Sequence, residues 1–400
     1  MKQSESIDDR SLRSRLQEIR SDRGVRAAIR FCADGEGMIL EDQVRLTLIP
    51  APPFAESERA ASFSKMLAEA GFDPTIDSLG NVVSAYEHYG ENPLLVGAHL
   101  DTVFPEGTPL HLDRKASVLS LPGIADNGAG LVAGLWLFKA ARAAGLRFER
   151  PLVLIANVGE EGIGNLRGVR HVFENPQWSG SEPEFVALDG CGIQRITNRG
   201  LGSRRYLVRM TGPGGHSWAD FPRPNPINGL AEAIQKFSSS MVSVPDGIAY
   251  NVGVIEGGIS VNAIPAEARM EVDLRSGDEG LLDDMESRLR GSVTTAARRI
   301  GVDARIEIIG NRPSGITSTD TLLVRTALET TRLLGVDPIL GMGSTDANVP
   351  MAMGLPAISI GAGGTCGRIH TEGEWFDSTN RNTGLERLLV LVAALAKLSQ

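Results

Sequence analysis

The stretch LLVGAHLD, residues 94–101, decides how the rest of the chain is interpreted. Its unbroken apolar run is typical of a strand buried on both faces, and the run stops at a histidine and an aspartate. Two further apolar runs stop at acids, LVLIANVGEEG at residues 152–162 and FVALDG at residues 185–190. Strands of one sheet that end in carboxylates and an imidazole would bring these side chains together at one edge of the sheet.

Strand and helix patterns alternate in the segment that contains these runs. The alternation begins near Asn81 and includes helical patterns over residues 128–144 and around Val169. This order predicts an α/β fold with a mixed, mostly parallel sheet sandwiched by helices. Ahead of it, the charged residues 1–45 predict an N-terminal helical extension, and residues 56–71 predict a helix that ends at a glycine.

The pattern changes after Gly200. Residues 201–312 carry strand and helix patterns in the order β-α-β-β-α-β, and the strands alternate apolar and polar residues. This order predicts an inserted α+β domain of the ferredoxin-like type, with helices on one face of its sheet. An α/β pattern returns in residues 313–400. We therefore expect a discontinuous first domain made of residues 1–200 and 313–400.

Composition excludes several classes of partner. The chain has 400 residues, too many for one ordinary core, and 42% of them are hydrophobic. It carries 40 Lys and Arg against 49 Asp and Glu, a formal net charge of -9, so we expect no nucleic acid partner. Residues 1–20 match neither a signal peptide nor a transit peptide, and no run approaches the roughly 18 apolar residues of a membrane span. We therefore expect a cytoplasmic protein with no membrane partner.

The cysteines are few and widely spaced. Cys32, Cys191 and Cys366 form an odd set without CxxC spacing, which favours reduced thiols over a disulfide framework. Cys191 and Cys366 are each close in sequence to a candidate site residue. We interpret them as small buried hydrophobic side chains beside the site and not as redox groups.

The adjacent acids Glu160 and Glu161 are the strongest local signal. Two carboxylates directly after a hydrophobic strand are costly to bury unless a cation or a proton compensates them. A solvated loop pair is the alternative, but the flanking glycines and the position at a strand end weigh against it. In a functional pair, one acid would bind a metal and the other would take a proton from the metal-bound water.

Four further positions complete the pattern. His99 is a candidate metal ligand with Asp101 as the carboxylate that orients it, although a lone histidine in a strand is more often a core residue. Asp126, in GIADNGAG, could bridge two cations with its two oxygens or could cap the following helix. Asp189 and His370 supply the remaining candidate ligands. Together these positions predict a pair of divalent metal ions, and paired metals beside a carboxylate suit hydrolysis.

Two glycine-rich segments suggest a different function. GAGLVAG at residues 128–134 and GAGG at residues 361–364 could be loops that hold a phosphate. Neither matches GxGxxG, and the first does not follow a strand. These segments therefore favour close-packing glycines over a dinucleotide site, and absent cofactor binding would exclude a nicotinamide-dependent oxidoreductase.

Taken in order, these residues resemble the aminoacylase, acetylornithine deacetylase, peptidase T and glutamate carboxypeptidase family of di-zinc metallohydrolases. The resemblance covers nearly the whole chain from about Leu46. Segment 343–364, GSTDANVPMAMGLPAISIGAGG, is most similar to peptidase T and its relatives; Asp346 and Asn348 there would shape a substrate pocket or cap the loop. The motifs that carry the resemblance are HLDTV (99–103), ADNGAG (125–130), GEEG (159–162), LDG (188–190) and IHTEGEW (369–375).

Carried onto this sequence residue by residue, the resemblance implies two metal ions per chain. One zinc ion would be held by His99 and Asp189, and the other by Glu161 and His370. Asp126 would bridge the two ions. We expect Zn²⁺, with Co²⁺ or Mn²⁺ as alternatives at such oxygen and nitrogen sites.

The resemblance also implies the roles of residues beside the metals. Glu160 would be the general base, and Asp101 would orient the imidazole of His99. The peptide bond between Asp126 and Asn127 is expected to be cis, as it is in the family, which would aim the bridging carboxylate.

The inserted domain resembles the lid and dimerisation domain of the family. His216, in GPGGHSWADFPRPNPI, would polarise the scissile carbonyl, in its own active site or in that of a partner subunit. Asn262 would contact the substrate or its oxyanion, and Arg275 would bind a substrate carboxylate, for which a guanidinium is well shaped. The loop around Gly363 would pass close to the substrate backbone.

We therefore expect a zinc peptidase fold with an inserted ferredoxin-like lid, active as a metal-dependent peptidase of the aminopeptidase type. It would cleave an amide bond of a small peptide or N-acyl amino acid with a metal-bridging water activated by Glu160, and it would form a homodimer through the lid. The first alternative is an N-acyl or N-carbamoyl amino acid amidohydrolase. The second is a non-catalytic protein of the same fold that holds a peptide in its cleft.

Overall fold

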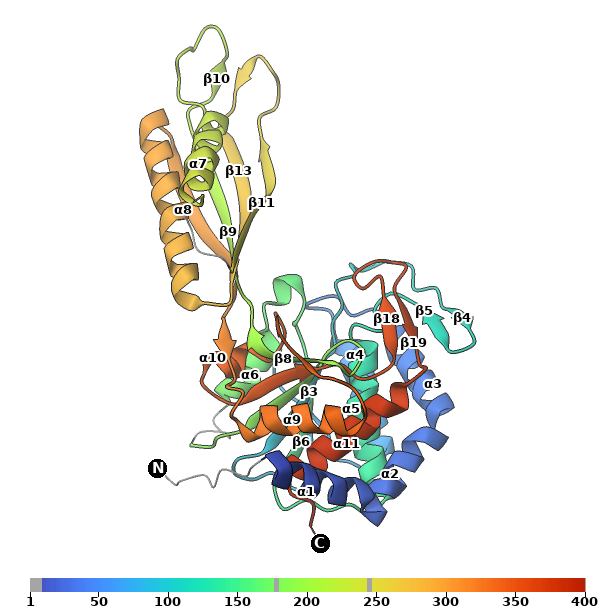
Figure 1. Ribbon diagram of the computed structural model, residues 1–400. Coiled ribbons are helices and arrows are strands. Elements are labelled where there is room, and N and C mark those ends of the chain that lie inside the picture. Colours follow the sequence, from blue (N-terminus) through green and yellow to red (C-terminus); the bar gives the residue numbers. More distant parts are fainter. Residues whose placement is uncertain (1–8, 176–179, 243–246, 400) are drawn as a thin grey trace. The chain divides into compact units, whose positions relative to one another are not determined.

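The computed structural model describes residues 9–175, 180–242 and 247–399. The chain divides into two compact units, of which the first comprises residues 1–200 and 316–400 and the second residues 201–315. Figure 1 shows the elements of both. The second unit ends at residue 315, where the sequence pattern indicated 312.

The described part of the first unit begins with three helices, α1 (Asp9–Ser21), α2 (Arg23–Asp34) and α3 (Glu36–Thr47). The expected helical extension is therefore helical from residue 9, and its residues 1–8 lie outside the described residues. The side chain of Asp22 caps α2 by accepting from two main-chain N–H groups. From α3, the amide Nε2 of Gln43 donates to the carbonyl oxygen of Ile124 at 2.6 Å. The extension therefore supports the loop that leads to Asp126.

A mixed sheet forms the centre of the first unit. Its strands follow the order β1-β2-β6-β3-β7-β17-β8-β15, with β16 beside β8. β3 pairs in parallel with both β6 and β7, whereas β2 runs antiparallel to β6 and β17 antiparallel to β8. The strand bounds are β1 (Thr75–Ile76), β2 (Val82–Ala85), β3 (Leu94–His99), β6 (Leu152–Asn157), β7 (Glu184–Leu188), β8 (Arg195–Gly200), β15 (Gly315–Ile316), β16 (Ile339–Gly343) and β17 (Ala357–Ile360).

Helices cover both faces of this sheet, because its central strands bury both faces. Along β3, Leu94 and Val96 join the core beneath α5, α9 and α11, while Leu95 joins the core beneath α6 and α10. Each fully buried side chain of this size stabilises the fold by about 1.5–3 kcal/mol. The helix bounds are α4 (Ser57–Glu69), α5 (Gly128–Ala143), α6 (Arg167–Glu174), α9 (Leu322–Leu333), α10 (Asn348–Ala352) and α11 (Arg381–Leu395), with a 3-10 turn at Gly162–Gly164. Among the helices of the described residues, none combines the length and apolar content of a membrane span.

A second, small sheet in the first unit was not expected. Its order is β18-β19-β5-β4, from β4 (Asp113–Lys115), β5 (Val118–Ser120), β18 (Thr365–Gly367) and β19 (Trp375–Asp377). Each strand has three residues, which is too short for a recognisable periodicity. Because β5 pairs with β19, the loop after β5 and the loop between β18 and β19 lie side by side.

The second unit has the predicted ferredoxin-like fold. Its sheet has the order β11-β13-β9-β14, and every pairing is antiparallel. Alternate residues of β13 are buried, and α7 and α8 pack on one face of the sheet (Figure 1). The bounds are β9 (Gly202–Thr211), β10 (Gly215–His216), α7 (Pro226–Ser240), β11 (Ile248–Gly257), β12 (Ala263–Ile264), β13 (Glu267–Ser276), α8 (Glu279–Ile300) and β14 (Asp303–Arg312).

The expectation of three reduced thiols is wrong. Cys191 and Cys366 form a disulfide with a Cα–Cα distance of 6.1 Å, within the range of such bonds. The two residues are 175 positions apart in the sequence, so no local spacing indicates the pair. Tertiary structure brings the loop after β7 against β18. Cys32 is free and buried.

Candidate metal centre

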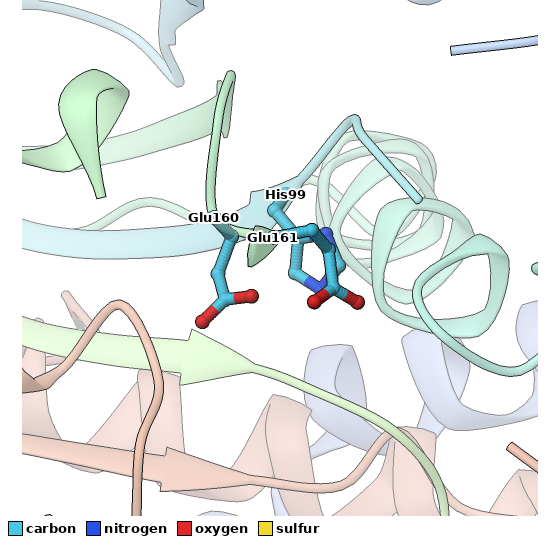
Figure 2. Close-up of side chains that lie close together, drawn as sticks. All are labelled: His99, Glu160 and Glu161. Atoms are coloured by element: carbon cyan, nitrogen blue, oxygen red, sulfur yellow. The ribbon is translucent and has the colours of Figure 1, made fainter. Parts of the chain in front are cut away.

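Three parallel strands deliver polar side chains to one edge of the main sheet. His99 is the last residue of β3, Glu160 and Glu161 follow β6, and Asp189 follows β7. β3 lies between the other two strands, and His99 is in register with Asn157 at the end of β6. Figure 2 shows the side chains of His99, Glu160 and Glu161 projecting toward the same side. The predicted convergence of strand ends is therefore present.

The small sheet supplies the other two positions. Asp126 lies in the loop after β5, and His370 lies in the loop between β18 and β19. The Asp126 Oδ1 atom is 3.0 Å from His99 Nε2, and its Oδ2 atom is 3.0 Å from His370 Nε2. The two oxygens of one carboxylate thus face two different imidazoles, which is the geometry of a bridging ligand.

The donor atoms form two groups that share Asp126. In the first group, His99 Nε2 also lies 4.0 Å from Asp189 Oδ1. In the second, His370 Nε2 lies 3.1 Å from Glu161 Oε1. The donor atoms within each group lie within 4.8 Å of one another, and so do those of His99, Glu160 and Glu161. Carboxylate oxygens and imidazole nitrogens at these separations fit a pair of divalent cations, zinc included.

Burial and the contacts between acids and imidazoles shift the pKa values at the centre, and these shifts favour protons on the imidazoles in the metal-free protein. Burial raises the pKa of Asp126, but hydrogen bonds with His370 and His99 outweigh burial and hold the pKa below its usual value. Burial and the charge of Asp126 raise the pKa of Asp189 to about 7. Hydrogen bonds to Asp126 and Glu161 raise the pKa of His370 to about 10. Cations that bind these groups would displace those protons.

Asp101 contacts His99 through two groups. Its main-chain carbonyl oxygen lies 3.0 Å from His99 Nδ1, and its carboxylate Oδ1 lies 3.8 Å from the same nitrogen. The carboxylate accepts the main-chain N–H groups of Glu160 at 2.9 Å and Glu161 at 2.7 Å. Asp101 therefore orients the histidine through its backbone and fixes the acid pair through its side chain.

Asn127 takes the capping role that was an alternative for Asp126. Its side-chain oxygen accepts the N–H of Gly130 at 3.1 Å at the start of α5, and its Nδ2 donates to the carbonyl of Leu188 at 2.8 Å. The peptide bond between Asp126 and Asn127 is cis, as expected. The Asp126 side chain is therefore available to the centre.

Glu374 is a supporting residue that sequence reasoning missed. Its side chain is fully buried, and Oε1 accepts the N–H groups of Ala125 at 2.8 Å and Asp126 at 3.0 Å. It belongs to the loop that carries His370, so it ties that loop to the bridging carboxylate. Burial raises its pKa. The one sequence signal was a second acid, flanked by Gly373, in the motif of the last histidine.

The structure also gives the contacts of Asp346 and Asn348, the two polar residues of segment 343–364 that were expected to shape a substrate pocket or to cap the loop. Asn348 caps its own loop, because its Oδ1 accepts the N–H of Thr345 at 3.0 Å. Asp346 is buried and accepts a hydrogen bond at 2.8 Å from Asn157, at the end of β6. Its charge contributes to the raised pKa of Asp189. Asp346 therefore belongs to the surroundings of the centre.

Close packing explains why residue 363 is a glycine. Its φ is +87°, and a Cβ atom there would lie 2.7 Å from the carbonyl oxygen of Arg381. Its main-chain groups pair with those of Gly192. A contact between this loop and a substrate stays a prediction.

His216 lies on the second unit with a defined ring orientation. The imidazole is exposed, and Nδ1 accepts the N–H groups of Trp218 at 3.2 Å and Ala219 at 3.3 Å. The neutral ring therefore carries its proton on Nε2, which can act as a donor. Its predicted role toward a scissile carbonyl stays a prediction.

Asn262 and Arg275 also belong to the second unit. Asn262 is exposed, and its Oδ1 accepts a hydrogen bond from the Ser260 hydroxyl at 2.6 Å. Arg275 is half-buried, and its Nε donates to Asp273 Oδ2 at 2.6 Å. Each side chain thus already has a partner within its unit, and substrate contact stays a prediction for both.

Comparison with known proteins agrees with this geometry. The sequence profile described as Peptidase family M20/M25/M40 matches residues 95–399. The succinyl-diaminopimelate desuccinylase of Corynebacterium glutamicum is 25% identical over 339 residues, which cover 80% of this chain and 86% of that protein. The crystal structure of a tripeptidase from Staphylococcus aureus has a TM-score of 0.75 at 20% identity and covers 90% of this chain and 98% of its own. That of aminopeptidase PepT from Bacillus cereus has a TM-score of 0.72 at 20% identity, with the same coverage of 90% and 98%. The chain therefore belongs to Peptidase family M20/M25/M40, and it is a hydrolase.

Proposed function

We propose that this hydrolase depends on divalent metal ions and cleaves an amide or peptide bond in a small peptide or an N-acyl amino acid. One observation carries the proposal. Asp126 directs its two oxygens at His99 and His370, each 3.0 Å away, so two ligand groups share one carboxylate. A structural ion pair would not need a carboxylate divided between two sets of donors.

Two zinc ions per chain are the proposed cofactors, with cobalt or manganese as alternatives. His99 and Asp189 would hold one ion and Glu161 and His370 the other, with Asp126 between them. When bound, such ions lower the pKa of water and polarise a substrate carbonyl. These five side chains would bind the ions, and side chains that are not ligands would transfer the protons.

Glu160 is the proposed general base. It lies beside Glu161 but outside the two groups that share Asp126, and its side chain is only 4% exposed. Its backbone is held by the Asp101 carboxylate at 2.9 Å. A fixed carboxylate next to the ligands can take a proton from the attacking water and return it to the leaving amine.

His216 is the proposed donor to the developing oxyanion. Its Nε2–H is free of the main-chain contacts that occupy Nδ1, and one well-placed donor of this kind is worth roughly 3–4 kcal/mol in other hydrolases. We propose that it acts within a homodimer formed through the second unit, in its own site or the partner's. Large apolar side chains near it support a protein contact there, since Trp218 is 88% exposed, Phe221 79%, Ile259 94% and Val261 100%.

Arg275 is the proposed carboxylate binder of the substrate. Its Nε is engaged by Asp273 at 2.6 Å, and a guanidinium has further N–H groups on its outer edge for a second carboxylate. Asn262 would add a neutral donor. Both substrate classes carry such a carboxylate, so this contact does not separate them.

The main alternative is an N-acyl or N-carbamoyl amino acid amidohydrolase. It is favoured by the relative named a desuccinylase, while the tripeptidase and aminopeptidase structures favour a peptidase. A panel of dipeptides and tripeptides, N-acyl amino acids and N-carbamoyl amino acids, assayed with zinc-loaded and cobalt-loaded protein, decides between them. The proposal expects the highest kcat/KM on short peptides with a free amino end.

The expectation of a non-catalytic peptide-binding protein is not retained, because the chain belongs to a family of hydrolases. Failure on the whole panel would therefore point to an amide substrate outside the classes tested.

A further inference from the structure

We propose that Cys191 and Cys366 are positioning residues for the candidate metal centre, and that their disulfide makes the centre sensitive to reductants. The inference rests on the proposed function, because it concerns the same two groups of ligands. Cys191 comes two residues after Asp189, in the loop that follows β7, and Cys366 lies in β18, four residues before His370. The disulfide therefore links the ligand loop of one group to the ligand loop of the other.

The loop that carries Asp189 has other attachments. The N–H of Asp189 donates to the carbonyl of Ile360 at 3.0 Å, and Gly192 exchanges two main-chain hydrogen bonds with Gly363 at 3.2 Å each. The buried guanidinium of Arg387 donates to the carbonyl of Ile193, in the loop after β7, and to the carbonyl of Gly361, in the loop after β17. These contacts would hold Asp189 in place without the disulfide.

The loop that carries His370 is held at its far end by Glu374, whose Oε1 accepts the N–H groups of Ala125 and Asp126. Its near end, which begins at β18, has fewer attachments. β18 has three residues and is the outermost strand of the small sheet, where, among the residues that the structure describes, it pairs with β19 alone. The His370 side chain is 51% exposed, and its backbone φ is +65°, a left-handed conformation that a non-glycine residue keeps only when its surroundings hold it. The disulfide at Cys366 joins β18 covalently to the loop after β7. Loss of that bond would therefore affect His370 much more than Asp189.

Access for a reductant is provided by partial exposure. Both cysteines of the bond are half-buried, in contrast to Cys32, which is 1% exposed and unpaired. Partly exposed disulfides exchange more readily than buried ones. With a dithiol, the S–S bond breaks, the two electrons and two protons of the dithiol pass to the two sulfurs, and the dithiol becomes a disulfide. With a phosphine, water supplies the two protons and its oxygen forms the phosphine oxide.

The consequence is selective. Reduction should weaken cation binding by the group of Asp126, Glu161 and His370, and should leave the group of His99, Asp126 and Asp189 nearly unchanged. Residues that hold a ligand in place typically change metal affinity by about 10- to 100-fold. We expect a loss of this size for one of the two ions, reversed by reoxidation with oxidised glutathione.

The first measurement needs no metal. Alkylation and mass spectrometry of the denatured full-length chain should find one free thiol before reduction and three after it, since the chain has three cysteines and Cys32 is free. Hydrogen exchange of the metal-free protein should then show faster exchange over residues 366–371 after reduction, with residues 189–193 unchanged. Three free thiols before any reductant is added, or equal exchange in both states, would overturn the proposal.

The second measurement is a Co²⁺ titration of metal-stripped protein, with the phosphine removed beforehand, followed by calorimetry and visible absorption. The double variant Cys191→Ser/Cys366→Ser should bind Co²⁺ like reduced protein under both conditions. The control Cys32→Ala should respond to reduction as the unaltered protein does. Two ions bound equally in both states would overturn this proposal and leave the proposed function standing, whereas no cation binding in either state would overturn both. A thiolate-to-cobalt band in reduced protein would show that the cysteines are ligands, and it would also overturn the positioning role.

Discussion

Acidic side chains gather in both units, but their partners differ. In the second unit, Arg204 contacts Glu279, Asp283 at 2.7 Å and Glu286 at 2.8 Å. In the first unit, the cationic side chains that contact Asp126, Glu161 and Asp189 in the described part of the chain are the imidazoles of His99 and His370. A guanidinium never releases its charge, whereas an imidazole can lose its proton and become a ligand.

This difference separates a structural cluster from a chemical one. The acids of the Arg204 cluster are paired with a guanidinium of the chain itself, and Glu279 and Asp283 lie at the surface of the unit, where ion pairs contribute little. Among the acids of the centre, Glu161 is buried and Asp126 and Asp189 are half-buried, and they share two protonatable rings, so their charge balance is left to groups that can be exchanged. The comparison predicts that cations change the first unit and not the second.

The largest effect should come from the bridging acid. Asp126→Asn removes the charge that both groups share, so we expect both cations to be lost and turnover to fall below detection. Metal analysis by mass spectrometry and an assay on the best substrate measure this. Asp283→Asn, which removes an acid from the Arg204 cluster, should keep two cations and full turnover. Equal behaviour of the two variants would remove the distinction between the clusters.

The proposed base should separate chemistry from metal binding. Glu160→Gln keeps the shape of the side chain but cannot accept a proton, so kcat should fall by about 10²- to 10⁴-fold while metal content stays at two per chain. Glu69→Gln on the exposed end of α4 is the matched control and should change neither. Retention of most of the activity in Glu160→Gln would mean that another group takes the proton.

A smaller effect is expected at Glu374. Glu374→Ala leaves two buried main-chain N–H groups at Ala125 and Asp126 without their acceptor, and we expect metal affinity to fall by about 10- to 100-fold. Glu374→Gln retains one carbonyl acceptor and should recover part of the loss. Metal affinity by competition with a chromophoric chelator measures both. An alanine variant with unchanged affinity would show that the contact only fills space.

The smallest effect concerns acid stability of the second unit. Burial raises the pKa of Glu279 and Glu286, but hydrogen bonds, including those from Arg204, lower both below the ordinary value of 4.5. Their contribution to stability is therefore fully present above about pH 4.5 and is lost as pH falls through the lower folded values. We expect Arg204→Met to reduce the decline in melting temperature between pH 5 and pH 3. A decline as steep as that of the unaltered protein would assign the acid sensitivity to other groups.

The site residues that follow a long apolar strand could be predicted from the sequence. His99, Glu160, Glu161 and Asp189 were placed correctly at one sheet edge, because three strands of five or six residues carry an unmistakable apolar pattern. The ferredoxin-like order of the second unit follows from ten-residue strands and two capped helices for the same reason.

Contacts that only the tertiary structure creates could not be predicted from the local sequence pattern. Asp126 and His370 meet through strands of three residues, so their place in the site was predicted from glycine-rich segments and the family resemblance and not from a strand pattern. Glu374 acts on main-chain N–H groups, which have no signature in a sequence. The disulfide joins residues 175 positions apart, and the orienting group of Asp101 is a backbone carbonyl, which every residue has.

A crystal structure of zinc-loaded protein, with diffraction recorded at the zinc absorption edge, tests the central claim most directly. We predict two anomalous peaks per chain, one between His99 and Asp189 and one between Glu161 and His370. Each should lie about 2.0–2.2 Å from one oxygen of Asp126. A single peak, or two peaks of which one does not contact Asp126, would contradict the shared-carboxylate centre.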